Sequence, residues 1–467
     1  MPPAVSVPVA ASAPPAASAD TGYAQRMAPV VFPADFLWGA ATAAHQVEGD
    51  NVTSDWWAWE RRADTPCREP SGIACDHYRR YADDIALLAS TGLNTYRFSV
   101  EWARIEPSDG TFDPAAIDHY RRVVETVRAH GLVPMVTLHH FTLPAWLADR
   151  GGWRAPETPA RFERYVRRVV AEIGSGVDWF CTINEPGVVA FGGYLGALGF
   201  PPGTRDVASW KEAIRGLVEG HRRAREAVRE LRPTARAGAT HSMQEWEADP
   251  GGRPVMEYLR RMNEDVFLEA CADDDFIGVQ TYTRVRVRLP AVLGPLARLA
   301  LAIPAIESTL VPLTVRRETR QASVQAAGSP RGRGSAGVAA ALGQDGERLT
   351  QMGYEFRPQA IAATVRRAAA LHPGKPIVVT EHGIATADDR ERVAFIRQGL
   401  AALHAAMADG VPLRGYVHWS LLDNFEWARG YEMTFGLVAV DRATQARTVR
   451  PSAYLLGQIA RTGRLEP

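Results

Sequence analysis

The sequence predicts a parallel α/β fold, a single (β/α)8 TIM barrel with long loops after its strands. Strand-like apolar runs alternate with helical stretches along most of the 467 residues, which is typical of parallel sheets rather than sandwiches. Eight such alternations can be counted, and eight is the number that closes a barrel. The competing doubly wound sheet is disfavoured because no strand leads into a glycine-rich nucleotide-binding loop.

The individual elements are placed by apolar periodicity and by stop signals. Helices end where the chain meets a glycine or a proline, as at Thr91-Gly92, His130-Gly131 and Pro233. The short apolar runs between these helices are the strands. Strands are expected at 36–41, 94–100, 133–138, 179–183, 235–240, 276–281, 377–380 and 415–420. Helices are expected at 78–90, 117–130, 161–173, 210–232 and 452–462.

Two stretches do not follow this alternation. Residues 1–30 are rich in Ala, Pro, Ser and Val and are expected to form a disordered tail, so the barrel domain is placed at 31–467. Residues 284–352 are first apolar and proline-rich, then rich in arginine and glycine, and are expected to form an irregular insertion or lid. No aromatic residues lie among these arginines, which favours a solvated loop over a nucleic-acid patch.

Composition and charge disfavour several kinds of partner. A net charge of +0 provides no bulk attraction for nucleic acid or anionic lipid. No membrane-spanning helix is expected, because the most apolar stretch, 289–313, is interrupted by prolines and charged residues. The first residues lack the basic start and apolar core of a secretory signal, and four cysteines are too few for a disulfide framework. We therefore expect a cytoplasmic location.

Two glutamates stand at the ends of predicted strands. The run 179–183 is followed by Asn184, Glu185 and a proline, which has no backbone donor and so ends the strand. The run 377–380 ends at Glu381, and a glycine turn follows. Either glutamate alone could be a surface charge. In a barrel, however, the C-terminal strand ends share one face, where two carboxylates suit glycosidic bond cleavage: one protonates the leaving oxygen, and the other attacks carbon or activates water.

Other strand ends carry groups that suit sugar recognition, namely amides, an imidazole, a carboxylate and flat aromatic faces. They are Gln46, His140, Asn184, Trp419, Glu426 and Trp427. Arg97 ends the second strand, and a buried arginine there needs a carboxylate partner. Each residue also has a structural alternative: Trp419 and Trp427 as core aromatics, His140 as a satisfied histidine, and Arg97 as an ion pair that holds the fold.

No metal ion and no cofactor are expected. His139 and His140 are neighbours on a strand and point to opposite faces, so they cannot readily share an ion. Asp273-Asp274-Asp275 lacks the spacing of a calcium loop and is interpreted as a solvated approach to a strand.

Five segments carry a resemblance to a known family. They are FLWGAATAAHQVEG at 36–49, YRFSVEWARI at 96–105, TINEP at 182–186, TEHG at 380–383 and WSLLDNFEW at 419–427. In this order they resemble glycoside hydrolase family 1, a family of retaining β-glycosidases, β-glucosidases above all, with a (β/α)8 fold. The resemblance covers nearly everything from residue 31 to the C-terminus and is weak only across 284–352.

The resemblance implies a role for each site residue. Glu185 matches the family's acid/base and Glu381 its nucleophile, while Arg97 and Tyr282 match groups that steady the nucleophile. Positions that hold the sugar in the −1 subsite are matched by Gln46, His140, Asn184, Glu426 and Trp427, with Trp419 beneath the ring. The implied reaction is hydrolysis of a small-molecule β-glycoside or oligosaccharide bearing a terminal, unphosphorylated β-D-glucosyl or closely related residue. It proceeds by double displacement through a glycosyl-enzyme intermediate.

Three positions depart from the family pattern. His382 stands where the family usually has Asn, Gln280-Thr281 where it has Asn-Tyr, and Phe141 where it has Trp. These changes leave the glutamate pair intact and bear on which sugar is preferred. The alternatives are β-galactosidase or β-fucosidase activity, a transglycosylase with the same pair, and a non-catalytic sugar-binding barrel, which would need the carboxylates lost or mispaired.

Overall fold

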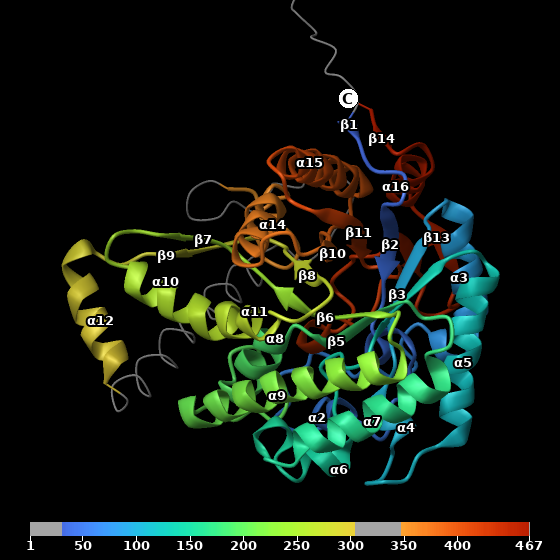
Figure 1. The fold of residues 1–467 in the computed structure, drawn as a ribbon, viewed down its shortest axis with the longest axis horizontal. Helices are drawn as coiled ribbons and strands as arrows, with labels where there is room; N and C mark the ends of the chain where they lie inside the picture. The colour runs from blue at the N-terminus through green and yellow to red at the C-terminus, as the bar shows by residue number, and fades with distance from the viewer. Residues whose placement is uncertain (1–29, 304–346, 467) are drawn as a thin grey trace, which may run out of the picture.

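Eight parallel strands close into a barrel in the order in which they follow one another along the chain (Figure 1). The structure is a computed structural model and describes residues 30–303 and 347–466. The last barrel strand pairs with the first from Gly415–Leu37 to Trp419–Ala41, which completes the closure. The predicted (β/α)8 barrel is confirmed. Its strands are β2 (Leu37–Ala41), β3 (Thr95–Ser99), β4 (Val133–Thr137), β5 (Trp179–Asn184), β6 (Arg236–Ser242), β8 (Ile277–Gln280), β10 (Ile377–His382) and β11 (Leu413–Trp419).

Helices follow the strands and cover the outside of the barrel. They are α3 (His77–Thr91), α5 (Pro114–Ala129), α7 (Thr158–Ile173), α9 (Val207–Leu231), α11 (Val266–Ala270), α14 (Ala360–Leu371), α15 (Asp389–Ala408) and α16 (Pro451–Thr462). Local chemistry sets their ends: Asp113 caps α5 by accepting from the N–H groups of Ala115 and Ala116, and Gly92 ends α3 in a left-handed conformation. The bounds of α14 and α15 were not predicted from the sequence, because their many alanines blur the contrast between apolar and polar faces.

Shorter elements lie in the loops. The helices are α1 (Ala44–Val47), α2 (Asp55–Trp59), α4 (Trp102–Ile105), α6 (Ala145–Ala148), α8 (Pro186–Val189), α10 (Arg253–Arg260) and α12 (Gly294–Ala302). Three small sheets pair β1 (Val30–Val31) with β14 (Arg464–Leu465), β7 (Glu245–Ala248) with β9 (Arg284–Val287), and β12 (Val438–Val440) with β13 (Arg447–Val449). Single turns of 3₁₀ or π helix lie at Gly152–Arg154, Ala190–Tyr194, Arg261–Asp265, Ala291–Leu293 and Trp427–Arg429.

The stretch 284–352 begins outside the barrel as part of a side lobe. Its first residues form β9, which pairs in parallel with β7, and α12 packs on α10 at the left of Figure 1. Residues 304–346 lie outside the described residues, so the role of this stretch as a lid stays a prediction. The predicted tail likewise lies outside them, apart from Val30 in β1.

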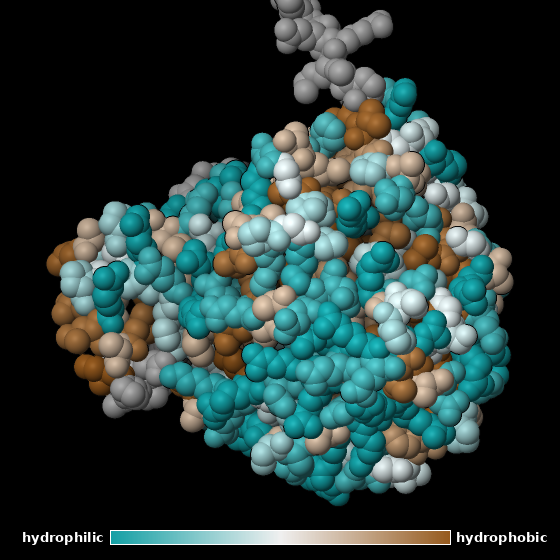
Figure 2. Space-filling model, in the orientation of Figure 1, coloured by the Kyte–Doolittle hydropathy of each residue, from teal (hydrophilic) through white to brown (hydrophobic). Residues whose placement is uncertain are grey.

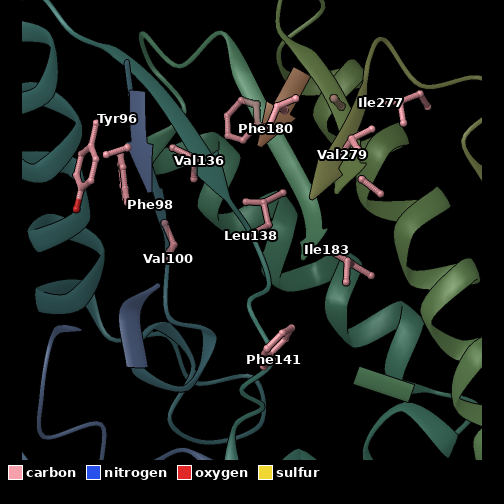
Figure 3. Close-up of a cluster of buried hydrophobic side chains, with 14 of the residues drawn as sticks. Tyr96, Phe98, Val100, Val136, Leu138, Phe141, Phe180, Ile183, Ile277 and Val279 are labelled. Atoms are coloured by element: carbon pink, nitrogen blue, oxygen red, sulfur yellow. The ribbon is translucent and has the colours of Figure 1, made fainter. Parts of the chain in front are cut away.

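The barrel has two apolar cores because alternate strand residues face opposite sides. Outward-facing residues such as Tyr96, Phe98 and Val136 pack in the layer between strands and helices (Figure 3). A smaller cluster joins residues at or beside β2, β4, β5, β8 and β10, which can meet only in the interior: Leu37, Met135, Trp179, Cys181, Phe276 and Val378. Arg97 lies between Tyr96 and Phe98, so its side chain enters the interior. Apolar side chains therefore form a floor, and polar ones gather toward the C-terminal strand ends.

The surface over the helices is largely polar, while the tip of the side lobe is apolar (Figure 2). On α12, Leu296 and Leu299 are 62% and 60% exposed. Within residues 30–303 and 347–466, no helix is both long and apolar enough to cross a membrane.

Candidate active site

The two predicted glutamates lie at the same end of the barrel. Glu381 is the last but one residue of β10, and Glu185 follows β5 directly. Both are nearly buried, at 3% and 8% exposed. Glu185 has a left-handed backbone with φ of 45°, held by its N–H bond to the carbonyl of Thr240 (2.8 Å) and by Pro186 at the start of α8. Such a backbone costs a non-glycine residue about 1–3 kcal/mol, and strain of this kind concentrates at functional sites.

Hydrogen-bond donors surround the carboxylate of Glu381. Its Oε1 accepts from Arg97 Nη1 (2.6 Å) and from Gln280 Nε2 (2.9 Å), and its Oε2 accepts from the hydroxyl of Tyr282 (2.6 Å). Burial raises the pKa of Glu381, whereas the charge of Arg97 and the bonds from Tyr282 and Arg97 act in the opposite direction. These donors stabilise the ionised form of a carboxylate that the interior would otherwise keep neutral.

Arg97 joins the two glutamates through Asn184, the neighbour of Glu185. Arg97 Nη2 donates to Asn184 Oδ1 (2.5 Å), and Gln280 Nε2 donates to the same oxygen (2.9 Å). Arg97 is only 1% exposed, so its charge is balanced inside this network. One guanidinium thereby ties together the ends of β3, β5 and β10.

Glu185 has a different environment. Its Oε1 is buried and accepts no hydrogen bond from the described part of the chain. Burial raises the pKa of Glu185 well above its usual range, and the negative charge of Glu381 raises it further, against a smaller opposite effect of Ser242. These effects favour the protonated form of Glu185.

Polar groups with unused hydrogen-bonding capacity line the space beside the glutamates. Gln46 Nε2 donates to the carbonyl of Phe425 (2.8 Å) and to Glu426 Oε2 (3.3 Å). Gln46 Oε1 and His140 Nδ1 are buried without a partner in the described ranges. Burial, followed by the charge of Glu381, raises the pKa of Glu426 to about 8. These groups can exchange hydrogen bonds with a neutral hydroxylated ligand.

Aromatic rings complete the site. The ring of His140 lies near those of Trp419 and Trp427, with centroids 5.8 Å and 6.2 Å away and interplanar angles of 21° and 16°. His140 Nε2 also lies 3.3 Å from Asn184 Nδ2. All ten residues that the sequence analysis assigned to the site thus gather at the C-terminal mouth of the barrel.

Three further residues belong to this environment and were missed from the sequence. Gln280 contacts Glu381 directly; the sequence marked it as a polar residue at the end of a buried strand and as a departure from the family pattern, but not as a site residue. Ser242, at the end of β6, forms a side-chain hydrogen bond with Glu185 that lowers its pKa. Burial raises the pKa of Tyr354 to about 12, with smaller effects of Glu426 and Glu185. Tyr354 follows the insertion, where no periodic pattern marks it.

Two residues at these departures from the family pattern, His382 and Thr281, face away from the site, whereas Gln280 contacts Glu381. His382 stacks on Phe395 of α15 (4.6 Å) and its Nδ1 lies 3.1 Å from the hydroxyl of Tyr416. Thr281 Oγ1 is 2.8 Å from Thr364 Oγ1 on α14. Both side chains therefore lie in the outer layer. Phe141, in contrast, packs against Trp427 with centroids 5.0 Å apart.

One interpretation of the acidic run before β8 is wrong. Asp274 is not solvated: it is 3% exposed, its Oδ2 accepts from the N–H of Ala239 (3.0 Å), and its Oδ1 faces His221 at 3.1 Å. This burial could not be predicted from the sequence, because the partner, His221, lies on a distant helix.

Comparisons with known proteins identify relatives of the whole chain. Residues 28–288 and 314–464 match the model of glycosyl hydrolase family 1. A thermostable β-glucosidase B from Thermobispora bispora is 36% identical over 453 residues, covering 92% of this chain and 90% of the relative. A bifunctional β-D-glucosidase/β-D-fucosidase from Bifidobacterium breve is 31% identical over 91% of this chain and 96% of its own length.

Solved structures agree with these relatives. A β-glycosidase from Pyrococcus horikoshii aligns with a TM-score of 0.78 and 33% identity, over 94% of this chain and 97% of that one. A β-glucosidase from Thermotoga maritima in complex with deoxynojirimycin aligns with a TM-score of 0.76 and 28% identity, over 93% and 100%. Since the family model spans both halves of the barrel, the chain belongs to glycosyl hydrolase family 1, the family of retaining β-glycosidases.

Proposed function

We propose that this protein hydrolyses terminal, unphosphorylated β-D-glucosyl residues, with Glu381 as the nucleophile and Glu185 as the acid/base. The observation that carries the proposal is the unequal environment of the two glutamates. Glu381 is held by three donors, whereas Glu185 Oε1 accepts none from the described residues. An ionised nucleophile beside a protonated acid is the pair of states that a retaining glycosidase needs at the start of its cycle.

In the first step, an oxygen of Glu381 attacks the anomeric carbon while the glycosidic bond breaks. The leaving oxygen takes the proton of Glu185, so the alcohol departs neutral and an ester joins the sugar to Glu381. Esterification removes the negative charge of Glu381, which lowers the pKa of Glu185. Glu185 then accepts a proton from water, which attacks the same carbon and releases the sugar with its original β configuration.

The groups that line the sugar pocket favour binding of an uncharged glycone. Gln46 Oε1 and His140 Nδ1 are free to accept from or donate to hydroxyl groups. Glu426, whose pKa burial raises to about 8, carries a proton in neutral solution and can both donate and accept. A sugar 6-phosphate would place further negative charge near Glu381, whose charge already raises the pKa of Glu426.

The test is a panel of nitrophenyl β-glycosides (gluco, galacto, fuco, manno, xylo) with the 6-phosphoglucoside as an added member. We expect the highest kcat/KM for the glucoside, and release of β-glucose as the first product when hydrolysis is followed by proton NMR. A 2-deoxy-2-fluoroglucoside should label Glu381, which peptide mass spectrometry would locate. First formation of α-glucose, or labelling of another residue, would contradict the mechanism.

A β-fucoside is the second candidate substrate, because the relative from Bifidobacterium breve is named for both activities. Comparable kcat/KM values for glucoside and fucoside would show that the sugar's 6-hydroxyl contributes little. Product analysis at high acceptor concentration would distinguish a hydrolase from a transglycosylase.

A cytoplasmic location also stays a proposal. It is supported by the four cysteines, all of which are buried free thiols, as expected in a reducing compartment.

A further inference from the structure

A second cluster of buried polar side chains lies between the barrel and its helices, away from the sugar pocket. His221 comes from α9, Cys271 follows α11, and Asp274 lies in the loop that leads into β8. The three side chains are 3%, 0% and 3% exposed. One ligand atom from each lies within 4.8 Å of the others. An imidazole, a thiol and a carboxylate in such contact are the ligand types of zinc and related divalent transition metals.

Two of the three separations within this cluster are close to those around a shared ion. His221 Nε2 is 3.1 Å from Asp274 Oδ1 and 3.8 Å from Cys271 Sγ. Around a tetrahedral zinc ion with ordinary bond lengths, nitrogen and oxygen ligands lie about 3.4 Å apart, and nitrogen and sulfur ligands about 3.5 Å apart. The observed separations fall within a few tenths of an ångström of these values.

The surroundings of the Asp274 carboxylate also favour a bound cation. Asp274 Oδ1 is buried and lies 3.1 Å from His221 Nε2 and 3.5 Å from Arg225 Nη1. A buried carboxylate needs positive charge beside it. A divalent cation held between Oδ1 and Nε2 would supply that charge.

Outer contacts already orient the ligands, as in established metal sites. His221 Nδ1 lies 2.8 Å from Thr182 Oγ1, which leaves Nε2 toward the cluster. Asp274 Oδ2 accepts from the N–H of Ala239 (3.0 Å), which leaves Oδ1 for an ion. Thr182 belongs to β5, three residues before Glu185, so the cluster connects α9 to the strand that carries the acid/base.

The charges of this cluster can be balanced either without a metal ion or with one. In the absence of a metal, the guanidinium of Arg225, whose Nη1 lies 3.5 Å from Asp274 Oδ1, would balance the carboxylate. With a divalent ion, Asp274 and the thiolate of Cys271 supply two negative charges, and the thiol proton is released to solvent. Arg225 then retains Asp273 as a partner, at 3.7 Å.

We propose that His221, Cys271 and Asp274 bind a structural Zn²⁺ ion, with His241 supporting the thiolate. His241 Nε2 lies 3.2 Å from Cys271 Sγ, where its N–H can donate to the sulfur. The ion would tie α9 and the turn after α11 to the outer side of β5 and β6. The site plays no part in the glycosidase chemistry, so its loss would lower thermal stability more than turnover.

The test uses the full-length chain, freed of metal by a chelator and then titrated with Zn²⁺ or Co²⁺. We expect about one equivalent of Zn²⁺ after equilibrium dialysis. Co²⁺ should produce a sulfur-to-metal charge-transfer band together with the visible absorption of a tetrahedral ion. Bound Zn²⁺ should also raise Tm relative to the chelated protein.

Matched variants assign the signal to the cluster. Cys271→Ser should lose the cobalt band and the zinc-dependent rise in Tm, and His241→Gln should weaken zinc binding roughly 10–100-fold. Cys75→Ser is the control, since it removes another fully buried thiol that instead lies 3.1 Å from the carbonyl of Asp423. This control should keep both signals.

Two results would overturn the proposal. One is a wild-type chain that binds no stoichiometric Zn²⁺, a result that needs no variant and so does not depend on whether variants fold. The other is a cobalt band that survives Cys271→Ser. Either would assign the cluster to the metal-free pairing of His221, Asp274 and Arg225.

Discussion

The ends of β5 and β10 place the same residue type in different surroundings. Glu381 accepts hydrogen bonds from Arg97, Gln280 and Tyr282, while Glu185 Oε1 accepts none from the described chain. Burial raises the pKa of both. The charge of Arg97 lowers both, but Arg97 forms a hydrogen bond only to Glu381 of the two. Neighbours across the barrel, rather than residue type, therefore set the different environments of the two glutamates.

The largest expected effect on activity comes from removing Glu381, which accepts hydrogen bonds from three side chains. Glu381→Gly should lower kcat for aryl β-glucosides by roughly 10⁴-fold or more, because no other group can form the covalent intermediate. Added azide should restore turnover and yield the α-glycosyl azide, which NMR identifies. A β-configured azide product would assign the nucleophile elsewhere.

Removal of Glu185 should lower activity less than removal of Glu381 does, and the loss should depend on the leaving group. Glu185→Ala should lower kcat/KM by roughly 10²–10⁴-fold for substrates with poor leaving groups, and far less for dinitrophenyl glucosides, which need no proton. The fall in wild-type kcat/KM at high pH, where Glu185 loses its proton, should disappear. Equal losses for good and poor leaving groups would exclude the acid role.

Loss of one donor to Glu381 should bring its environment closer to that of Glu185. Tyr282→Phe removes a hydrogen bond to a charged group worth about 1.5–3 kcal/mol, so kcat/KM should fall roughly 10–100-fold. The hydrogen bond from Tyr282 lowers the pKa of Glu381, so its removal should raise that pKa. The acidic limb of the pH profile should then move to higher pH.

Tyr165→Phe is the matched control for this variant. Its hydroxyl donates to the carbonyls of Val100 and Leu138, outside the site. It should lower Tm without moving the acidic limb. If Tyr282→Phe behaved in the same way, the hydrogen bond to Glu381 would have no catalytic role.

The smallest effect is expected at the neighbour of Glu381. His382 faces Phe395 and Tyr416 in the outer layer, so His382→Asn should cost about 0.5–3 kcal/mol of stability and leave the order of substrates in the glycoside panel unchanged. Gln280→Asn, which shortens a side chain that touches Glu381, should instead lower kcat. A reversed order of substrates in His382→Asn would show that the outer layer controls sugar choice.

Much of the fold could be predicted because its signals are local. Pro186 ends β5 just beyond Asn184 and Glu185, and Gly383 follows the end of β10, so both glutamates could be placed at strand ends from the sequence alone. The side lobe could not be placed in this way. The pairing of β7 with β9 joins residues some forty positions apart, which no periodicity reveals.

Most residues of the site could be predicted from the sequence, but the contacts between them could not. Ten residues were identified from strand ends and from the family resemblance, yet Gln280 was noted only as a departure, and Asp274 was expected in solvent. A register shift between β10 and β8 brings Glu381 opposite Gln280, and Asp274 is buried because His221 lies on a helix distant in sequence.

The sequence by itself determined the eight strands, the ends at which the glutamates stand, and the family, because apolar period, proline and glycine act over a few residues. Only the tertiary structure decided that Arg97 meets Glu381 across 284 positions and that His221 meets Asp274. The physical reason is that closure and register of the barrel, rather than distance along the chain, determine which buried charges become neighbours.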